Sequence, residues 1–413
     1  MGPPPTRPEL PISGPKAWLF GLIAIGLAVG ATILFAEFVL HVIGYPPART
    51  DHQQLFVEYD SVRGWRNIPG ARGEYRTQEY DVALTYNSHG IRGPERAYAK
   101  PPGTYRVVLL GDSFLEGYSV NREERVAEVL ERLLNAHDSS RRAEVIALGT
   151  AGYSTDQELL WMESEGLRYR PDAVVLLFCE NDVWYNAQAR YWRGGKPLFR
   201  IQGDSLVLTN VPVPPPMPEA RRGWSLHKFL EQNSKLYWIV AGFVKNHPRL
   251  HALVIRAGLA KVPPEMVLEA GDRLPVPEEF AVYRTRSTPE VDRAWKTTEL
   301  LMRRMKRRVE ESGAAFISFL IPSRGDIYTQ ETAVRADGGK AAEGWDPKAV
   351  ARMFHSICVR EQIRCVDPTG RFRQAAVDLS RRGERLYYKY DWHWNANGHR
   401  LAAEILAEQL QAD

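Results

Sequence analysis

The sequence has little cysteine, with three residues in a chain of 413. Three cysteines are too few for a disulfide scaffold, and they lack the paired short spacings of a zinc ribbon. Long blocks of like charge are also absent, and 54 Lys and Arg against 50 Asp and Glu give a formal net charge of +4. Such a chain has no stretch that could follow a phosphate backbone, so we expect no nucleic-acid partner.

Apolar residues, in contrast, are numerous enough for a packed protein. Hydrophobic residues make up 44% of the sequence and charged residues 25%, a balance that disfavours a chain disordered throughout, so we expect most of it to fold. The length permits two or three domains. The sequence contains no internal repeat, so the domains must be found from their local patterns.

Residues 17–43 form a long apolar segment near the N-terminus. The stretch 17–36 has no charged residue and matches the ~20 residues that a helix needs to cross the hydrocarbon core of a membrane. The apolar character continues past Glu37 to Ile43, whereas the apolar region of a cleaved signal peptide is typically ~7 to 15 residues long. We therefore expect residues 17–43 to be an uncleaved transmembrane anchor in a lipid bilayer, with a cleaved signal peptide as the alternative.

The charges that flank this segment indicate its orientation. Arg7 and Lys16 precede it and Arg49 follows it, and the flank that is richer in Lys and Arg stays in the cytosol. This bias places residues 1–16 in the cytosol and everything after Tyr45 outside the cytoplasmic membrane. We therefore expect a single-pass protein of the cytoplasmic (inner) membrane with an extracytoplasmic, periplasmic domain.

An extracytoplasmic location bears on the cysteines, because that compartment is oxidising. Cys358 and Cys365 could form a disulfide across a short loop, but the sequence does not give their geometry and the pairing stays open. Cys179 follows an apolar stretch, and we expect it to be a buried strand residue.

Two patterns divide the rest of the chain. Residues 44–103 alternate short β-like pieces with turn residues and are expected to form a β-rich lead-in. In residues 104–413, apolar strands alternate with helical stretches, which predicts a parallel sheet covered by helices on both faces. An insertion, residues 186–292, interrupts this domain with a hairpin, a proline cluster and helical stretches near 226–244 and 250–257. The predicted strands are residues 105–110, 143–148, 173–178, 315–321 and 363–366.

Ser113 stands in a Gly-Asp-Ser turn at the carboxyl end of the first predicted strand. Ligand sites of open α/β folds lie at this edge of the sheet, so the position suits a nucleophile. A serine needs a base, and His393 could accept its proton and return it to the leaving group. Asp391 is the nearest carboxylate that could hold the imidazole, with Asp367 as a remote candidate. Taken alone, these residues could also be turn or capping residues, and Asp391, His393 and His399 could be metal ligands.

Two further positions could stabilise an oxyanion. Gly152 follows the second predicted strand, where the absence of a Cβ would let its backbone N–H approach a substrate. Asn181 follows the third strand and could offer its side-chain amide. Each could instead be an ordinary loop residue. Because the carboxyl ends of parallel strands share one edge, we expect Ser113, Gly152 and Asn181 to meet there.

In this order along the chain, Ser113, Gly152, Asn181 and His393 resemble the four blocks of the SGNH, or GDSL-type, hydrolase family. The resemblance implies a three-layer, flavodoxin-like α/β fold in which Ser113 is the nucleophile, His393 the base and Asp391 the third member of the triad. It also implies an oxyanion hole formed by the Ser113 backbone N–H, Gly152 and Asn181. Neither a metal nor an organic cofactor is expected.

The similarity runs from about residue 106 to residue 410, with two departures from the family pattern. The third block reads Cys179-Glu180-Asn181-Asp182 instead of Gly-x-Asn-Asp. The asparagine is kept, but its support changes because Cys179 stands where the family has glycine. The last block has an Asp391-x-His393 spacing, like that of the alginate acetyltransferase branch, instead of Asp-x-x-His. With its N-terminal membrane helix, the chain is similar to membrane-anchored bacterial members thought to act on cell-surface glycans or lipids.

The expected function is therefore that of a serine esterase or acyl hydrolase acting outside the cytoplasmic membrane on an acylated, for example O-acetylated, glycan or lipid. An O-acyltransferase would use the same triad and oxyanion hole, so residue types do not separate transfer from hydrolysis. A protein that only binds or assembles glycans is another alternative, because Trp392 and Trp394 could form a stacking surface. The insertion is expected to wall the cleft, and the sequence indicates neither the acyl group nor the oligomeric state.

Overall fold

The computed structural model describes residues 15–45, 52–77, 79–138, 141–191, 194–216, 226–245, 247–260, 262, 267, 271–328 and 341–411. The chain divides into two compact units, Met1–Ala48 with Trp224–Phe243, and Arg49–Gly223 with Val244–Asp413. Residues 1–14 of the expected cytosolic tail lie outside the described residues, as do parts of the lead-in and the insertion. The domain boundaries expected from the sequence stay a prediction.

The first unit contains the apolar N-terminal helix α1 (Pro15–Val42). Its segment Trp18–Val42 has a mean hydropathy of 2.4 and is not buried by other parts of the described chain. The helix is therefore long and apolar enough to cross a membrane, although a signal sequence has the same properties.

The helical stretch expected near 226–244 is two helices, which end and begin around Ser234. They are α7 (Leu226–Asn233) and α8 (Lys235–Lys245). At the start of α8, Glu37 of α1 accepts the backbone N–H of Lys235 at 2.6 Å and that of Leu236 at 3.0 Å. A carboxylate at this position satisfies N–H groups that have no partner within the helix.

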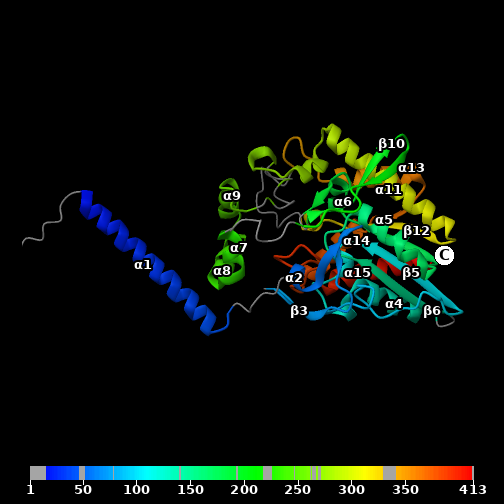
Figure 1. Ribbon diagram of the computed structural model, residues 1–413, viewed down its shortest axis with the longest axis horizontal. Coiled ribbons are helices and arrows are strands. Elements are labelled where there is room, and N and C mark those ends of the chain that lie inside the picture. Colours follow the sequence, from blue (N-terminus) through cyan, green and yellow to red (C-terminus); the bar gives the residue numbers. More distant parts are fainter. Residues whose placement is uncertain are drawn as a thin grey trace, which may run out of the picture. The chain divides into compact units, whose positions relative to one another are not determined.

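A parallel sheet forms the centre of the second unit (Figure 1). It has five strands in the order β13-β12-β7-β5-β6. The register pairs Gly111 of β5 with Gly149 of β6, and Leu110 with Leu176 of β7, so these strands end close to one another. The predicted parallel sheet is thereby confirmed. Its strands are β5 (Thr104–Gly111), β6 (Arg142–Gly149), β7 (Ala173–Phe178), β12 (Ala315–Leu320) and β13 (Arg364–Val366).

Helices cover both faces of this sheet. Alternate residues of each strand point to opposite faces, so each strand contributes apolar side chains to two cores. On β5, Val108 and Leu110 belong to one core, and Val107 and Leu109 to the other. The first core is covered by α5 (Thr155–Ser164), α11 (Pro289–Glu311) and α13 (Ala349–Glu361), and the second by α4 (Val126–His137), α14 (Thr369–Ser380) and α15 (Ala396–Gln411) (Figure 1). The sequence pattern does not single out α14.

The lead-in forms two antiparallel strand pairs. Strand β1 (Val57–Asp60) pairs with β2 (Gly64–Asn67), and β3 (Arg72–Arg76) pairs with β4 (Asp81–Thr85), after a short helix α2 (His52–Phe56). These elements have a small core of their own, formed by Phe56, Tyr80, Val82, Leu84 and Tyr86. A small β-rich segment therefore precedes the α/β sheet, as the sequence predicts.

The insertion contains the expected hairpin, β10 (Leu198–Gln202) with β11 (Ser205–Thr209). It also contains the short pair β8 (Arg190–Tyr191) and β9 (Gly194–Gly195), helix α9 (Pro248–Arg256) and a 3₁₀ helix at Glu278–Tyr283. A second 3₁₀ helix of the insertion is Gly271–Arg273. Shorter elements elsewhere in the second unit are α3 (Ser113–Glu116), α6 (Glu180–Tyr185), α12 (Arg324–Ile327) and the 3₁₀ helices Arg122–Glu124 and Gly166–Tyr169.

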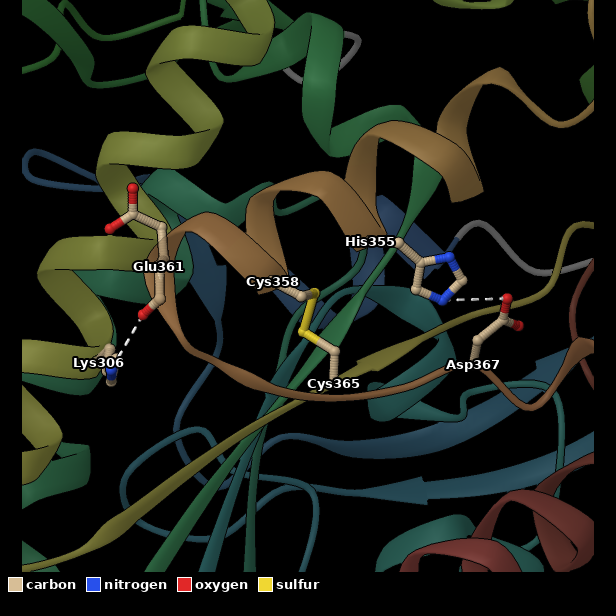
Figure 2. Close-up of a disulfide and its surroundings, with 6 residues drawn as sticks. All are labelled: Lys306, His355, Cys358, Glu361, Cys365 and Asp367. Atoms are coloured by element: carbon tan, nitrogen blue, oxygen red, sulfur yellow. Dashed lines mark hydrogen bonds and ion pairs between the residues drawn. A yellow bond between two sulfur atoms is a disulfide. The ribbon is translucent and has the colours of Figure 1, made fainter.

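The disulfide that the sequence leaves open is formed between Cys358 of α13 and Cys365 of β13 (Figure 2). Asp367, which follows β13, makes an ion pair with His355 at 3.5 Å. Cys179 is buried, as expected, but it lies directly after β7 and before α6 instead of inside the strand.

Candidate active site

A tight connection between β5 and α3 places Ser113 at the carboxyl edge of the sheet. The strand ends at Gly111, and the Asp112 carboxylate then accepts the Phe114 backbone N–H at 2.9 Å, which caps the short helix. Gly111 is required because an added Cβ would lie 2.9 Å from the Cβ of Leu115. Burial raises the pKa of Asp112 to about 6, and its capping bond keeps the turn closed.

Ser113, His393 and Asp391 are joined by hydrogen bonds. Ser113 Oγ lies 2.7 Å from His393 Nε2. On the other side of the ring, His393 Nδ1 is hydrogen-bonded to Asp391 Oδ1, which also accepts the His393 backbone N–H at 3.0 Å. Because a carboxylate only accepts, Nδ1 carries the proton and Nε2 is the acceptor for the Ser113 hydroxyl. This arrangement can transfer the hydroxyl proton to the imidazole.

The surroundings of the pair keep Asp391 charged and make His393 a stronger base. Burial would raise the pKa of Asp391, but the His393 imidazole and the hydrogen bonds hold it well below its ordinary value. Burial would likewise lower the pKa of His393, but the Asp391 carboxylate raises it above its ordinary value, with smaller contributions from Asp112 and Glu116. A neighbouring negative charge therefore outweighs the cost of desolvating the imidazolium.

Gly152 and Asn181 line the same cavity as Ser113, which has a volume of about 380 Å³. Gly152 has a φ of 75°, a backbone conformation that favours glycine, in the loop after β6. Asn181 is the second residue of α6, and its Nδ2 lies 3.5 Å from the Tyr191 hydroxyl. The structure thus brings together all five residues that the sequence selects: Ser113, Gly152, Asn181, Asp391 and His393.

A buried carboxylate that the sequence reasoning missed holds the Gly152 loop. Glu116 is 1% exposed, and its Oε2 accepts the Ala151 backbone N–H at 2.6 Å. Its Oε1 accepts hydrogen bonds from the Tyr86 hydroxyl and, at 2.9 Å, from His52 Nε2 of the lead-in. The sequence offers one weak signal for this role, an acidic residue within an apolar turn.

Side chains of the insertion form part of the cavity wall. They are mainly apolar or aromatic: Tyr191, Val262, Pro277, Phe280, Val282 and Tyr283. Trp392, which is 37% exposed, lines the cavity beside His393, whereas Trp394 is fully buried. The two tryptophans therefore do not form one stacking surface.

His399 has a structural environment. It is buried, and its Nδ1 accepts the Val126 backbone N–H at 3.3 Å. Burial and the charges of Arg125 and Arg92 hold the pKa of His399 well below its ordinary value, so the ring is neutral. In the part of the chain that the structure describes, no group of three or more His, Cys, Asp or Glu side chains could hold a metal ion.

A sequence model of the GDSL-like Lipase/Acylhydrolase family matches residues 109–348, which is more than half of the chain. The matched region includes Ser113, Gly152 and Asn181, and it ends before the segment that carries Asp391 and His393. No curated protein matches the chain.

Solved structures of low sequence identity are also similar. A lipase/acylhydrolase from Enterococcus faecalis is 11% identical over 75% of this chain and 96% of its own, with a TM-score of 0.37. An acetyl xylan esterase, AlAXEase, is 12% identical over 74% and 99%, with a TM-score of 0.38. An acetyl-xylooligosaccharide esterase from Geobacillus Stearmophilus is 11% identical over 74% and 94%, with a TM-score of 0.36. At these values the likeness carries no argument about substrate.

Proposed function

We propose that this chain, which belongs to the GDSL-like lipase/acylhydrolase family and is an ester-hydrolysing enzyme, acts through a triad of Ser113, His393 and Asp391. We further propose that it works outside the cytoplasmic membrane on an acylated glycan or lipid. The observation that carries the triad is the 2.7 Å contact between Ser113 Oγ and His393 Nε2. The hydrogen bond of Asp391 to the far nitrogen of the same ring supports it.

In the first half of the reaction, Ser113 Oγ attacks the carbonyl carbon of the ester and its proton passes to His393 Nε2. The carbonyl oxygen becomes an oxyanion, which the backbone N–H groups of Ser113 and Gly152 and the Asn181 amide stabilise. Asp391 stabilises the imidazolium. When the tetrahedral intermediate collapses, His393 donates the proton to the leaving alcohol, and the acyl group remains on Ser113.

In the second half, a water molecule attacks the acyl-enzyme and gives a proton to His393. The same N–H groups stabilise the second oxyanion. Collapse breaks the bond between the acyl group and Ser113, whose oxygen recovers the proton from His393, and the carboxylic acid leaves. A sugar hydroxyl in place of water would give acyl transfer with the same residues.

The cavity supports a substrate larger than a free acyl group. Its volume of about 380 Å³ lies within the ~300 to 1,000 Å³ of small-molecule sites. The exposed face of Trp392 at its edge suits a sugar ring, and the apolar wall around Phe280 suits an acyl chain. Both chemistries are present in an acylated glycan and in a glycolipid.

An assay of the full chain on small acyl esters and on O-acetylated polysaccharide tests the proposed reaction. We expect acid release from both, and none from Ser113→Ala at equal folding. Added sugar should not divert the acyl group from water to a new ester. A folded wild-type protein that hydrolyses neither substrate would contradict the proposal and favour a glycan-binding role.

The proposed location rests on α1 and on the Lys and Arg bias around it. A phosphatase fused to the C-terminus is active only outside the cytoplasm, so we expect an active fusion in the membrane fraction. An inactive phosphatase fusion, matched by an active cytosolic reporter at the same position, would reverse the orientation. Activity in the soluble periplasmic fraction would instead indicate cleavage after α1.

A further inference from the structure

A carboxylate of the lead-in holds the loop that carries Asp391. Glu79 Oε1 accepts the Lys389 backbone N–H at 2.7 Å, and Glu79 Oε2 accepts the N–H groups of Tyr390 at 2.9 Å and Asp391 at 2.6 Å. Residues 389–391 belong to no helix or strand. Glu79 therefore supplies these N–H groups with the partners that regular secondary structure would otherwise give them.

The next residue of the lead-in contacts the Asp391 side chain itself. The Tyr80 hydroxyl donates to Asp391 Oδ2 at 2.8 Å, while Asp391 Oδ1 faces His393. Both carboxylate oxygens are thus engaged, one from each side, and this fixes the rotation of the carboxyl group. Burial and the Asp391 charge raise the pKa of Tyr80 far above its ordinary value, so its hydroxyl remains a donor.

Packing holds Tyr80 in this orientation. The side chain is 8% exposed, and its ring packs against those of Tyr75 and Tyr388, at centroid distances of 5.6 and 5.0 Å. Tyr75 is in β3 and Tyr388 precedes the Asp391 loop, so the lead-in and the loop are packed together around this hydroxyl.

We propose that Glu79 and Tyr80 are positioning residues of the active site, which hold the Asp391 backbone and carboxylate in the orientation that His393 needs. This inference rests on the proposed role of Asp391 in the triad. It gives the lead-in a part in the reaction, because a charge-assisted hydrogen bond to Asp391 favours the ionised carboxylate that stabilises the imidazolium. Without these contacts, the carboxylate can rotate away from Nδ1 and the rate of proton transfer falls.

The lead-in offers matched controls for both side chains. The Tyr98 hydroxyl donates to a Glu165 oxygen at 2.7 Å, and Glu95 accepts the Ser88 backbone N–H at 2.7 Å. These bonds have the same chemistry as those of Tyr80 and Glu79, but within the described part of the chain neither Tyr98 nor Glu95 contacts Ser113, His393 or Asp391. Tyr98→Phe and Glu95→Ala therefore report what the loss of such a bond does to the fold alone.

The test compares variants of the full chain in detergent, with kcat, KM and thermal unfolding measured on one small ester. We expect Tyr80→Phe to lower kcat by about 10-fold with KM unchanged, since a hydrogen bond to a charged group is lost. Glu79→Ala should lower kcat similarly and Glu79→Gln by less, because the amide oxygen still accepts an N–H group. Tyr98→Phe and Glu95→Ala should retain the wild-type kcat.

Two further measurements separate positioning from general stability. The low-field proton signal of the His393–Asp391 hydrogen bond, assigned by its loss in His393→Ala, should move or broaden in Tyr80→Phe and stay in Tyr98→Phe. In an Asp391→Asn background, Tyr80→Phe should cause no further loss of kcat.

Each result has one meaning for the proposal. Wild-type kcat in both Tyr80→Phe and Glu79→Ala overturns it, as does a kcat loss that Tyr98→Phe and Glu95→Ala share at equal loss of stability. If Asp391→Asn itself keeps the wild-type rate, the proposed triad fails. If Asp391→Asn is slow and the Tyr80 and Glu79 variants are fast, only the positioning role fails.

Discussion

The lead-in and the insertion both lack a catalytic motif, yet they contact the site in different ways. Lead-in side chains reach the loops that carry the chemistry: Tyr80 bonds to Asp391, and Trp65 Nε1 donates to the Ala151 carbonyl at 3.0 Å, next to Gly152. Insertion side chains such as Phe280 line the space that a substrate would occupy. Changes in the lead-in should therefore lower kcat for every ester, and changes in the insertion should alter which esters are bound.

Burial agrees with this division. Trp65 and Tyr80 are 3% and 8% exposed, as expected for side chains that fix other residues. Phe280 is only partly buried and lines the cavity. A buried donor has one partner and one geometry, whereas a cavity wall can accept ligands of several shapes.

The largest effects are expected from Ser113→Ala and His393→Ala. Their kcat losses are the reference for variants of the lead-in and of the insertion. Each should lower kcat by ~10⁴-fold or more, and the double variant should be about as slow as either single one, because the two residues act as a unit. Steady-state hydrolysis of a small acyl ester measures this. Losses that multiply in the double variant would show that the serine and the histidine act independently.

Asp391→Asn should have the next largest effect, a fall in kcat of ~10²- to 10⁴-fold. Because the lead-in acts through Asp391, its variants should lower kcat by no more than Asp391→Asn does. In the wild type, kcat/KM should fall as acid protonates His393, with a midpoint above ~6.5 because the pKa of this imidazole is raised. Loss of the carboxylate removes the main cause of that rise, so the midpoint should move to lower pH.

The rate and the midpoint of Asp391→Asn are read from one set of kcat/KM measurements across pH. A wild-type rate with an unmoved midpoint would show that Asp391 is not part of the triad. The lead-in could then not act on the reaction through Asp391. Asp367 would not replace it without rearrangement, because it is paired with His355.

Phe280→Ala should change selectivity and leave the chemistry in place. Removing a ring from the cavity wall should lower kcat/KM for a longer acyl ester by ~10-fold, while kcat for the acetyl ester stays within about twofold. Val207→Ala, an exposed residue of the same insertion, serves as the control. An equal kcat loss for all esters would show that the insertion, like the lead-in, affects the chemical step and not substrate selectivity.

The smallest effect on activity is expected from the double variant Cys358→Ser with Cys365→Ser. The disulfide joins positions seven apart in sequence, and closing so short a loop stabilises the fold by ~2 kcal/mol. Urea unfolding should show this loss, and kcat should not change, since neither cysteine lines the cavity. A large fall in kcat would mean that β13 also supports the site.

The sheet and the meeting of Ser113, Gly152 and Asn181 could be predicted because the information is local. Continuous apolar runs such as Ala173–Phe178 indicate buried parallel strands. The residues that follow three such strands must then meet at one edge, which brings Ser113, Gly152 and Asn181 together. His393 lies 280 positions from Ser113, and the sequence selects it with Asp391 because a serine nucleophile needs a base and because their block resembles that of the family.

The supporting residues could not be predicted, because their partners are distant in the chain. Tyr80 and Asp391 are separated by 311 positions, and Glu116 and Ala151 by 35. Neither Tyr80, in the lead-in, nor Glu116, in α3, has a sequence feature that identifies its partner. The Cys358–Cys365 pair stayed open for a related reason, since spacing alone does not give the geometry of a disulfide.

The proposed reaction requires Ser113 to be an activated nucleophile, and a fluorophosphonate probe measures this directly. We predict a single adduct, located by peptide mass spectrometry on Ser113, with labelling that is lost in Ser113→Ala and strongly slowed in His393→Ala. Labelling should be slower in Tyr80→Phe and unchanged in Phe280→Ala. Folded wild-type protein that forms no adduct, or an adduct on another residue, would contradict the account.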